Sequence, residues 1–181
     1  VHHLPGVMVG KNSVMMGDLG EVPLTRSDGV MLIPVQSSPT GPDGEYYSPG
    51  GGFTYTDCLL LMGRWCDDGG LSWTTSDRIV GDPKRTTRGL IEPTIAELQD
   101  GSILMVMRGS NDRNHDLPGY KWMARSYNGG QTWSTPKPWT YTDNDVFFSP
   151  SATSQLIPHS SGSLYWMGNI SEQNPRGNSP R

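Results

Sequence analysis

The sequence has little of what several common functional classes require. Charged residues make up 18% of the chain, the formal net charge is −4 at pH 7, and lysines and arginines do not cluster. A nucleic-acid surface needs a basic patch or stripe, so the sequence argues against a nucleic-acid partner. The longest unbroken apolar runs, such as residues 58–62, are far shorter than the roughly 20 apolar residues of a membrane-spanning helix. We therefore expect no membrane span.

Cysteine and histidine are also scarce, which limits disulfide and metal chemistry. Cys58 lies in a strand-like run and Cys66 in a turn, so we expect two free thiols. The four histidines are scattered, at His2, His3, His115 and His159. No Cys-x-x-Cys or His-x-x-x-His spacing occurs, and we predict no metal site and no other cofactor.

Glycine, proline and tryptophan are abundant instead. The 181 residues include 23 Gly, 15 Pro and 6 Trp, a composition that favours short strands joined by tight turns. No 3.6-residue apolar periodicity extends beyond a turn or two, which argues against helices. The length fits one domain or part of one. We therefore predict an all-β chain.

A repeat of about sixty residues organises the sequence. The segments "CDDGGLSW" (66–73) and "SYNGGQTW" (126–133) align without a gap, 60 residues apart. A second pattern recurs around Gly29, Gly101 and, more loosely, Gly162: an apolar segment, a turn and a second apolar segment. Asp-Gly and Ser-Gly turns supply the positive φ that tight hairpins need. Each repeat therefore predicts two hairpins, with the Trp packed against the next unit.

Four antiparallel strands that repeat in this way are typical of a propeller blade. The repeats place blades at approximately residues 21–82 and 90–140, with an incomplete blade at 147–181. A propeller ring normally has at least four blades. We therefore interpret residues 1–181 as part of a single β-propeller domain, about two and a half blades, whose missing blades come from the rest of a longer chain.

The repeats resemble the Asp-box (BNR) repeats of the sialidase superfamily, the exo-α-sialidases with a six-bladed propeller. The pattern of that repeat is Ser-x-Asp-x-Gly-x-Thr-Trp. The first copy keeps Asp68, Gly70 and Trp73, with Cys66 for Ser and Ser72 for Thr. The second copy keeps Ser126, Gly130, Thr132 and Trp133, with Asn128 for Asp. Asp boxes mark a fold and not an activity, because they also occur in other glycosidases and in receptor propellers.

The segment "EPTIAELQDGSILMVMR" (92–108) carries a more specific resemblance. A charge at the end of a buried strand costs free energy unless it is paired or used, and Glu92 and Arg108 are two such charges. Sialidases place a Glu at the start of an inner strand and, after a hairpin turn, one Arg of a three-Arg cluster at the end of the next strand. The resemblance implies that Glu92 polarises a tyrosine nucleophile and that Arg108 binds the substrate carboxylate.

The resemblance implies further substrate-binding residues. The next Arg of the cluster lies one blade later, where "NPRGNSPR" offers Arg181, which we prefer, and Arg176. Gln36 ends the equivalent strand of the first blade and is a candidate for lining the pocket. In the family order the first cluster Arg and the acid/base Asp precede these blades and the nucleophilic Tyr follows them. We therefore expect the 181 residues alone to be inactive.

The chemistry of an acidic sugar agrees with these residue types. Guanidinium groups that converge on a sugar carboxylate form bidentate, charge-assisted hydrogen bonds. Because that carboxylate repels an anionic nucleophile, these enzymes depart from the usual pair of carboxylates and use Tyr. A Glu beside the phenol accepts its proton. None of the seven tyrosines here is at the position expected for the nucleophile.

We therefore predict that the whole protein is a retaining glycosidase acting on a sialylated or other acidic glycan. The substrate class favours a secreted or periplasmic location. Two other functions stay open: a non-catalytic carbohydrate-binding Asp-box propeller, and an Asp-box glycosidase acting on neutral polysaccharide. For the residues themselves, an ordinary ion pair between Arg108 and Glu92, or a solvated Glu92 before its proline, is the simpler interpretation.

Overall fold

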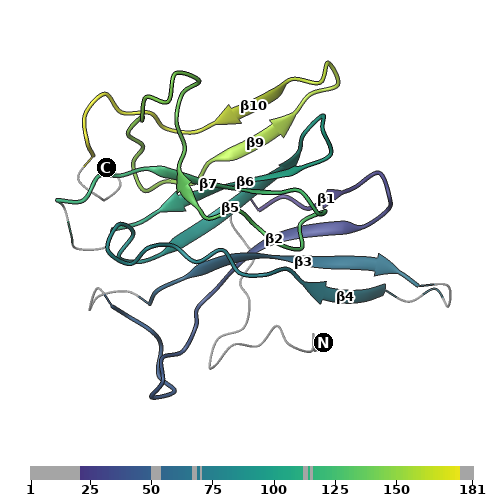
Figure 1. Cartoon of the computed structure of the whole chain (residues 1–181), viewed down its shortest axis with the longest axis horizontal. Coiled ribbons are helices and arrows are strands. Elements are labelled where there is room, and N and C mark those ends of the chain that lie inside the picture. Colours follow the sequence, from purple (N-terminus) through teal and green to yellow (C-terminus); the bar gives the residue numbers. More distant parts are fainter. Residues whose placement is uncertain are drawn as a thin grey trace.

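The computed structural model describes residues 21–49, 54–66, 69, 71–111, 114 and 116–175, and the structural statements below concern these residues. They form ten strands in three antiparallel sheets that follow one another along the chain (Figure 1). No helix occurs in the described part, and so none there is long and apolar enough to cross a membrane. The all-β prediction is confirmed.

The first sheet has the strand order β1-β2-β3-β4. Its strands are β1 (Leu24–Thr25), β2 (Met31–Ser37), β3 (Asp57–Trp65) and β4 (Leu71–Thr75). The β2–β3 register places Gln36 opposite Cys58 and Ser37 opposite Asp57. The end of β2 and the start of β3 therefore lie at the same end of the sheet.

The second sheet repeats this order as β5-β6-β7-β8. Its strands are β5 (Leu90–Glu97), β6 (Ile103–Gly109), β7 (Lys121–Ser126) and β8 (Lys137–Pro138). Every residue of β6 except Arg108 is buried, as the continuous apolar run predicts for a strand covered on both faces.

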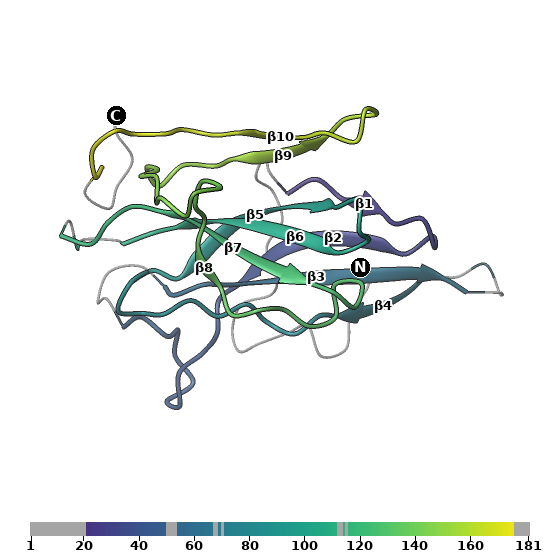
Figure 2. The same cartoon turned by 45° about the horizontal axis from the view of Figure 1, so that its top comes forward.

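The third sheet contains β9 (Gln155–Pro158) and β10 (Leu164–Met167). Figure 2 shows the three sheets stacked as layers, with β9 and β10 on one side of β5–β7 and β3 and β4 on the other. The inner strand β5 contacts both β2 and β9. Sheets of four, four and two strands in this stack are consistent with a partial propeller.

Strand β6 supplies side chains to two separate cores. Ile103, Met105 and Met107 belong to the core between the first and second sheets, together with Leu32 and Leu60. The alternate residues Leu104 and Val106 belong to the core between the second and third sheets, together with Ala96 and Leu156. Because successive side chains of a strand point to opposite faces, one strand can join two layers. By the same alternation Arg108 faces the third sheet.

The turns that join the strands agree with the sequence pattern. Gly29, Gly101 and Gly162 all have positive φ, at 81°, 78° and 85°. The second Asp box forms a closed hydrogen-bonded turn, in which Ser126 Oγ accepts from the Gly130 N–H at 2.9 Å. Asn128 Oδ1 accepts from the Thr132 N–H at 3.0 Å, as an Asp would. Positions 67, 68 and 70 of the first box lie outside the described residues.

The two box tryptophans pack on apolar clusters, but neither packs on the core shared with the next sheet along the chain, where the repeat predicts them. Trp133 is half-buried against the core that joins the first and second sheets. Trp73 packs on a smaller cluster of Val35, Leu59 and Leu61, on the other face of the first sheet. A Cβ placed on Gly63 would lie 2.9 Å from the Trp73 ring, so the indole lies directly over the β3 backbone.

Candidate functional site

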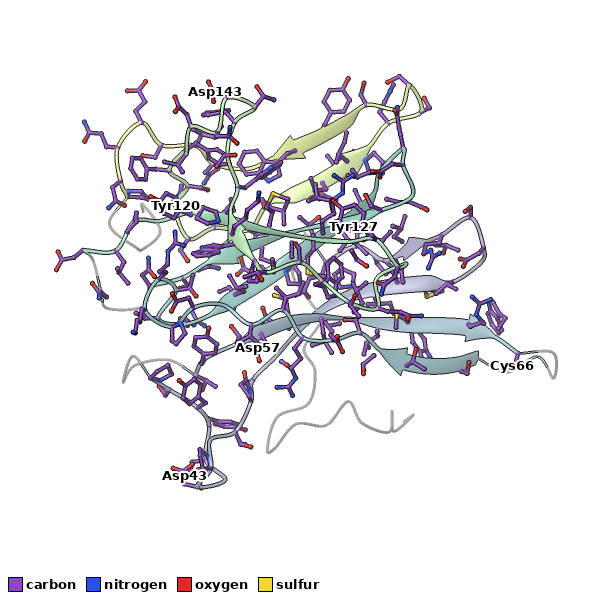
Figure 3. All side chains as sticks on the ribbon, in the orientation of Figure 1. Asp43, Asp57, Cys66, Tyr120, Tyr127 and Asp143 are labelled. Carbon is purple, nitrogen blue, oxygen red and sulfur yellow. The ribbon has the colours of Figure 1, made fainter. Side chains whose placement is uncertain are left out.

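One end of the three sheets collects polar side chains from neighbouring strands. Strands β2 and β6 end there, and β3, β5 and β7 begin there, because paired neighbours are antiparallel and Gln36 contacts Glu92. The segment that leads into β9 reaches the same end, where Thr153 contacts Glu92. In Figure 3, Asp57 at the start of β3 and Tyr120 just before β7 lie on one side, and Cys66 and Tyr127, beyond the other ends of the same strands, lie on the opposite side. This end is where Glu92 and Arg108 meet.

Glu92 and Arg108 form a largely buried ion pair. Arg108 Nη1 donates to Glu92 Oε1, and the two side chains are only 17% and 10% exposed. The second carboxylate oxygen, Oε2, accepts from Thr153 Oγ1 at 2.8 Å, while Arg108 Nε donates to Ser151 Oγ at 2.7 Å. Glu92 is therefore not a solvated residue. The ion pair of the simpler interpretation is present, and it is built into the junction between the second and third sheets.

The backbone of Glu92 is strained. Its φ is 51°, and the β5–β6 register shifts between Ile91 and Thr94. A non-glycine residue with positive φ costs on the order of 1–3 kcal/mol and persists only where its surroundings hold it. Gln36 does so, because its Oε1 accepts from the Glu92 N–H at 2.9 Å. The side-chain oxygen of Gln36 thus accepts a hydrogen bond from the Glu92 backbone, and a role of Gln36 in substrate binding stays a prediction.

Lys121 is a buried cation beside this pair. It lies opposite Arg108 in the β6–β7 register, with an exposed fraction of 0%. Its Nζ donates to the carbonyl oxygen of Pro150 at 3.3 Å and to that of Ala152. Burial, and to a smaller extent the Arg108 charge, lowers the pKa of the Lys121 ammonium to about 8, while Glu92 opposes the shift. Lys121 is still mostly protonated at pH 7.

The cluster therefore holds two cations and one carboxylate. The bonds of Arg108 to described residues use Nε and Nη1, which leaves Nη2 without a partner among them. An uncompensated positive charge with a free guanidinium N–H is suited to a carboxylate ligand. The sequence pattern missed Lys121, whose one signal is a lone Lys at the head of the apolar strand "KWMA".

Asp57 is a second buried carboxyl at this end of the sheets. It is 2% exposed, and its Oδ2 lies 3.5 Å from Arg78 Nη1. Burial raises the pKa of the Asp57 carboxyl to about 6, although the Arg78 guanidinium opposes the shift. Along β3 it alternates with Cys58, which belongs to the core facing the second sheet. Asp57 therefore points away from Glu92 and does not join its cluster.

Other candidate groups fall outside the cluster. Tyr55 is buried with its hydroxyl donating to the Gly81 carbonyl oxygen at 2.6 Å, and burial raises its pKa well above the usual value. Cys58 is buried, Cys66 is exposed, and both are free thiols. Among the described residues, no group of three or more His, Cys, Asp or Glu side chains could hold a metal ion.

A cavity of about 630 Å³ lies at the other end of the sheets. It is lined by residues of the β5–β6 and β9–β10 turns, including Gln99, Asp100 and His159, and by Arg125. Arg125 pairs with Asp100 at 2.6 Å, and Gln99 Nε2 donates to the Gly162 carbonyl oxygen at 3.1 Å. The Gln99 bond joins the two hairpin turns, and the Arg125 pair joins β7 to the first of them. The cavity contains neither Glu92 nor Arg108 and is separate from the candidate site.

Comparison with protein families identifies the repeats. The profile of the BNR repeat-like domain matches residues 10–178. The chain belongs to this family. BNR repeat-like domains are found in glycosidases such as sialidases, and they fit a sialidase-like or other carbohydrate-related function in general. The BNR part of the sequence interpretation is therefore confirmed, and the specific sialidase assignment stays a prediction.

Among solved structures, this BNR repeat-like chain is similar to a protein of unknown function from Dyadobacter fermentans DSM 18053. The TM-score is 0.46 and the sequence identity is 18%. The similarity covers 87% of this chain and 39% of that one, so the chain spans well under half the length of that protein. No curated protein matches the chain.

The structure brings together only some of the predicted site residues of this BNR repeat-like domain. Glu92 and Arg108 are in contact, and Gln36 binds the Glu92 backbone. Arg176 and Arg181 lie outside the described residues, so their roles stay predictions. Ser151, Thr153 and Lys121 complete the cluster and were not predicted from the sequence.

Proposed function

We propose that this chain is part of an exo-glycosidase that removes a terminal sialic acid, or a related acidic sugar, with retention of configuration. The observation that carries the proposal is the buried pair of Glu92 and Arg108, held at the end of an inner strand with an excess of positive charge beside it. Membership of a family found in glycosidases such as sialidases supports the same function.

In this proposal Arg108 binds the sugar carboxylate. Nη2, which has no partner among the described residues, would bind the ligand, while Nη1 and Nε stay fixed by Glu92 and Ser151. Because Nε and Nη1 are both held by hydrogen bonds, the guanidinium cannot rotate freely, and the direction of Nη2 is fixed before the ligand binds. Arg181 or Arg176 would add a second guanidinium, and a glycan with a carboxylate on its terminal sugar would be the partner.

Glu92 would accept the proton of a tyrosine nucleophile that the longer protein supplies. A neutral phenol avoids repulsion by the substrate carboxylate, and a neighbouring Glu makes it reactive near neutral pH. The fixed hydrogen bonds to Arg108 and Thr153 orient the Glu92 carboxylate for this role. The strained backbone of Glu92 fits a functional position, because such strain gathers at active sites.

A second candidate function is a non-catalytic binding propeller. Both oxygens of Glu92 already have partners, and no described tyrosine is among them. A protein with this arrangement and no nucleophile elsewhere would bind an acidic sugar without cleaving it.

Calorimetric titration of the chain with N-acetylneuraminic acid, its methyl ester and lactose tests the binding half of the proposal. We expect the acid to bind and the ester to bind at least ~10-fold more weakly, because the ester removes a charge-assisted hydrogen bond. Arg108→Lys should weaken binding of the acid by a similar factor, since Lys is a point charge without the planar fork. Equal binding of the neutral lactose would contradict the proposal and favour a neutral polysaccharide.

A matched control is Arg125→Lys, at the other end of the same sheet, which should leave the affinity unchanged. Turnover is measured with a fluorogenic sialoside on a version of the protein extended by its neighbouring blades. We expect turnover by the extended protein and none by the 181 residues alone. Binding without turnover in the extended protein would identify the binding propeller instead.

A further inference from the structure

Lys121 is a charged residue in a fully buried position. A fully buried ammonium loses its hydration, which is costly unless hydrogen bonds replace the lost water. Lys121 obtains them from two backbone carbonyl oxygens, those of Pro150 and Ala152, which lie far along the chain in the segment that leads into β9. The cost is thus met by contacts with one specific segment, residues 149–154, which we name the β9 entry loop.

The β9 entry loop has no regular secondary structure, and a few contacts fix it. At its start, Ser149 Oγ donates to the Asn169 carbonyl oxygen at 2.7 Å. Just beyond its end, the Leu156 N–H donates to Thr94 Oγ1 on β5 at 3.0 Å. Between these two points the Lys121 ammonium lies against the loop backbone.

Successive residues of the loop serve two purposes in alternation. The carbonyl groups of residues 150 and 152 accept from Lys121, while the side chains of residues 151 and 153 reach the ion pair. Ser151 binds Arg108 Nε at 2.7 Å, and Thr153 binds Glu92 Oε2 at 2.8 Å. One buried cation therefore holds the peptide unit that precedes Ser151 and the peptide unit that precedes Thr153.

We propose that Lys121 is the positioning residue of the candidate site: it fixes the β9 entry loop so that Ser151 and Thr153 hold Arg108 and Glu92 in place for an acidic sugar. Its effect on sugar binding rests on the proposed function, whereas its effect on the loop does not. Among the described residues, the hydrogen bonds of the Lys121 side chain go to the loop backbone and not to Glu92 or Arg108, so Lys121 acts through the loop.

Charge gives Lys121 a second effect on the same site. The groups that act electrostatically on it are Arg108, opposite it across the strands, and Glu92. Two cations beside one carboxylate leave a net positive charge in a poorly hydrated place, where Coulomb interactions are stronger than in water. The Lys121 charge therefore adds to the attraction for a ligand carboxylate that Arg108 binds directly.

The test compares Lys121→Met with Lys137→Met, the same substitution on the exposed edge strand β8 of the same sheet. Hydrogen exchange of the amides of residues 151–154 and the affinity for N-acetylneuraminic acid are measured for both. We expect Lys121→Met to speed exchange in the loop and to weaken binding by at least ~10-fold each, because it removes charge-assisted hydrogen bonds. Lys137→Met should change neither.

A double-substitution cycle separates positioning from general loss of structure. If Lys121 acts through the loop, Ser151→Ala should weaken binding in the wild-type chain but add little in the Lys121→Met background. Fully additive losses, or unchanged loop exchange in Lys121→Met, would overturn the proposal. Lys121→Gln keeps an N–H donor but removes the charge. If Lys121→Met does not fold, the same exchange and affinity measurements are made on Lys121→Gln. It should protect the loop in part while still weakening binding.

The two proposals fail in different ways. If the wild-type chain does not bind the acid, the proposed function is wrong, and the exchange measurement still decides whether Lys121 fixes the loop. If the wild-type chain binds the acid and Lys121→Met binds it equally well, the inference about Lys121 is wrong and the proposed function stands.

Discussion

Arg108 on β6 and Lys121 on β7 face each other across the strand pair, on the side of the sheet that Glu92 also occupies. Two adjacent cations repel each other, and a negative charge between or beside them offsets that repulsion. Glu92 supplies one such charge, and a bound acidic sugar would supply a second. Among the described residues, the cluster of Glu92, Arg108 and Lys121 carries one more positive than negative charge, which supports the proposed acidic substrate.

Replacing Glu92 by Gln should separate binding from catalysis. The substitution keeps the shape of the side chain and removes the negative charge beside Arg108 and Lys121. We expect the affinity for N-acetylneuraminic acid to hold or to rise by up to ~10-fold, because the ligand then faces two cations and no carboxylate. Turnover of a fluorogenic sialoside by the extended protein should fall by at least ~100-fold, because the general base is lost.

Glu97→Gln, near the other end of β5, is the matched control and should affect neither binding nor turnover. Weaker binding in Glu92→Gln would mean that the carboxylate serves mainly to hold Arg108 in position. Unchanged turnover would remove Glu92 from the proposed mechanism.

The contact between Glu92 and Arg108 could be predicted because only local structure separates them. Between the two residues lie a strand, the tight turn at Gly101 and a second strand, and such a hairpin fixes its own register. The positive φ of the turn glycines follows from the same local rules.

The rest of the cluster depends on structure that the sequence pattern does not encode. Lys121 follows the long connection after β6, and Ser151 and Thr153 lie within the β9 entry loop, so no turn type sets where these side chains meet the hairpin. The conformation of Glu92 runs against a local rule, because a residue before proline normally adopts extended backbone angles and Glu92 has a φ of 51°. Contacts from Gln36, on another sheet, override that preference.

Asp57 should make the stability of the protein depend on pH between about 4 and 6. Its pKa is raised from 3.8 to about 6 in the folded state, so the folded protein binds the proton more tightly than the unfolded chain. The stabilisation is complete below pH 3.8 and is lost as the pH rises through 6. We expect the free energy of unfolding to lose up to about 3 kcal/mol over this interval, measured by urea denaturation.

Asp57→Asn should remove this dependence, because the amide does not titrate. Asp43→Asn, at the tip of the exposed loop between β2 and β3 (Figure 3), should leave it intact. A wild-type protein whose stability does not fall between pH 4 and 6, relative to Asp57→Asn, would show that Arg78 offsets the burial of Asp57 fully.

Gly89 should be the glycine at which alanine is most damaging to the site. It lies where the second sheet meets the first: the Thr56 N–H donates to the Arg88 carbonyl oxygen at 3.1 Å, and the Leu90 N–H donates to the Thr56 carbonyl oxygen at 3.0 Å. With φ at 82°, a Cβ on Gly89 would lie 2.1 Å from the Thr56 oxygen. Gly89→Ala therefore has to separate the two sheets three residues before Glu92.

Gly101→Ala is the control that introduces the backbone strain without a steric clash. Gly101 has nearly the same φ, 78°, but a Cβ there meets nothing within 4 Å. We expect Gly101→Ala to lower the free energy of unfolding by about 1–2 kcal/mol, which is the cost of the left-handed backbone alone. Gly89→Ala should cost about 2–4 kcal/mol and also weaken binding of N-acetylneuraminic acid, because the shift reaches the Gln36–Glu92 hydrogen bond. Equal losses of stability and unchanged binding in both variants would show that the contact between the first two sheets does not position Glu92.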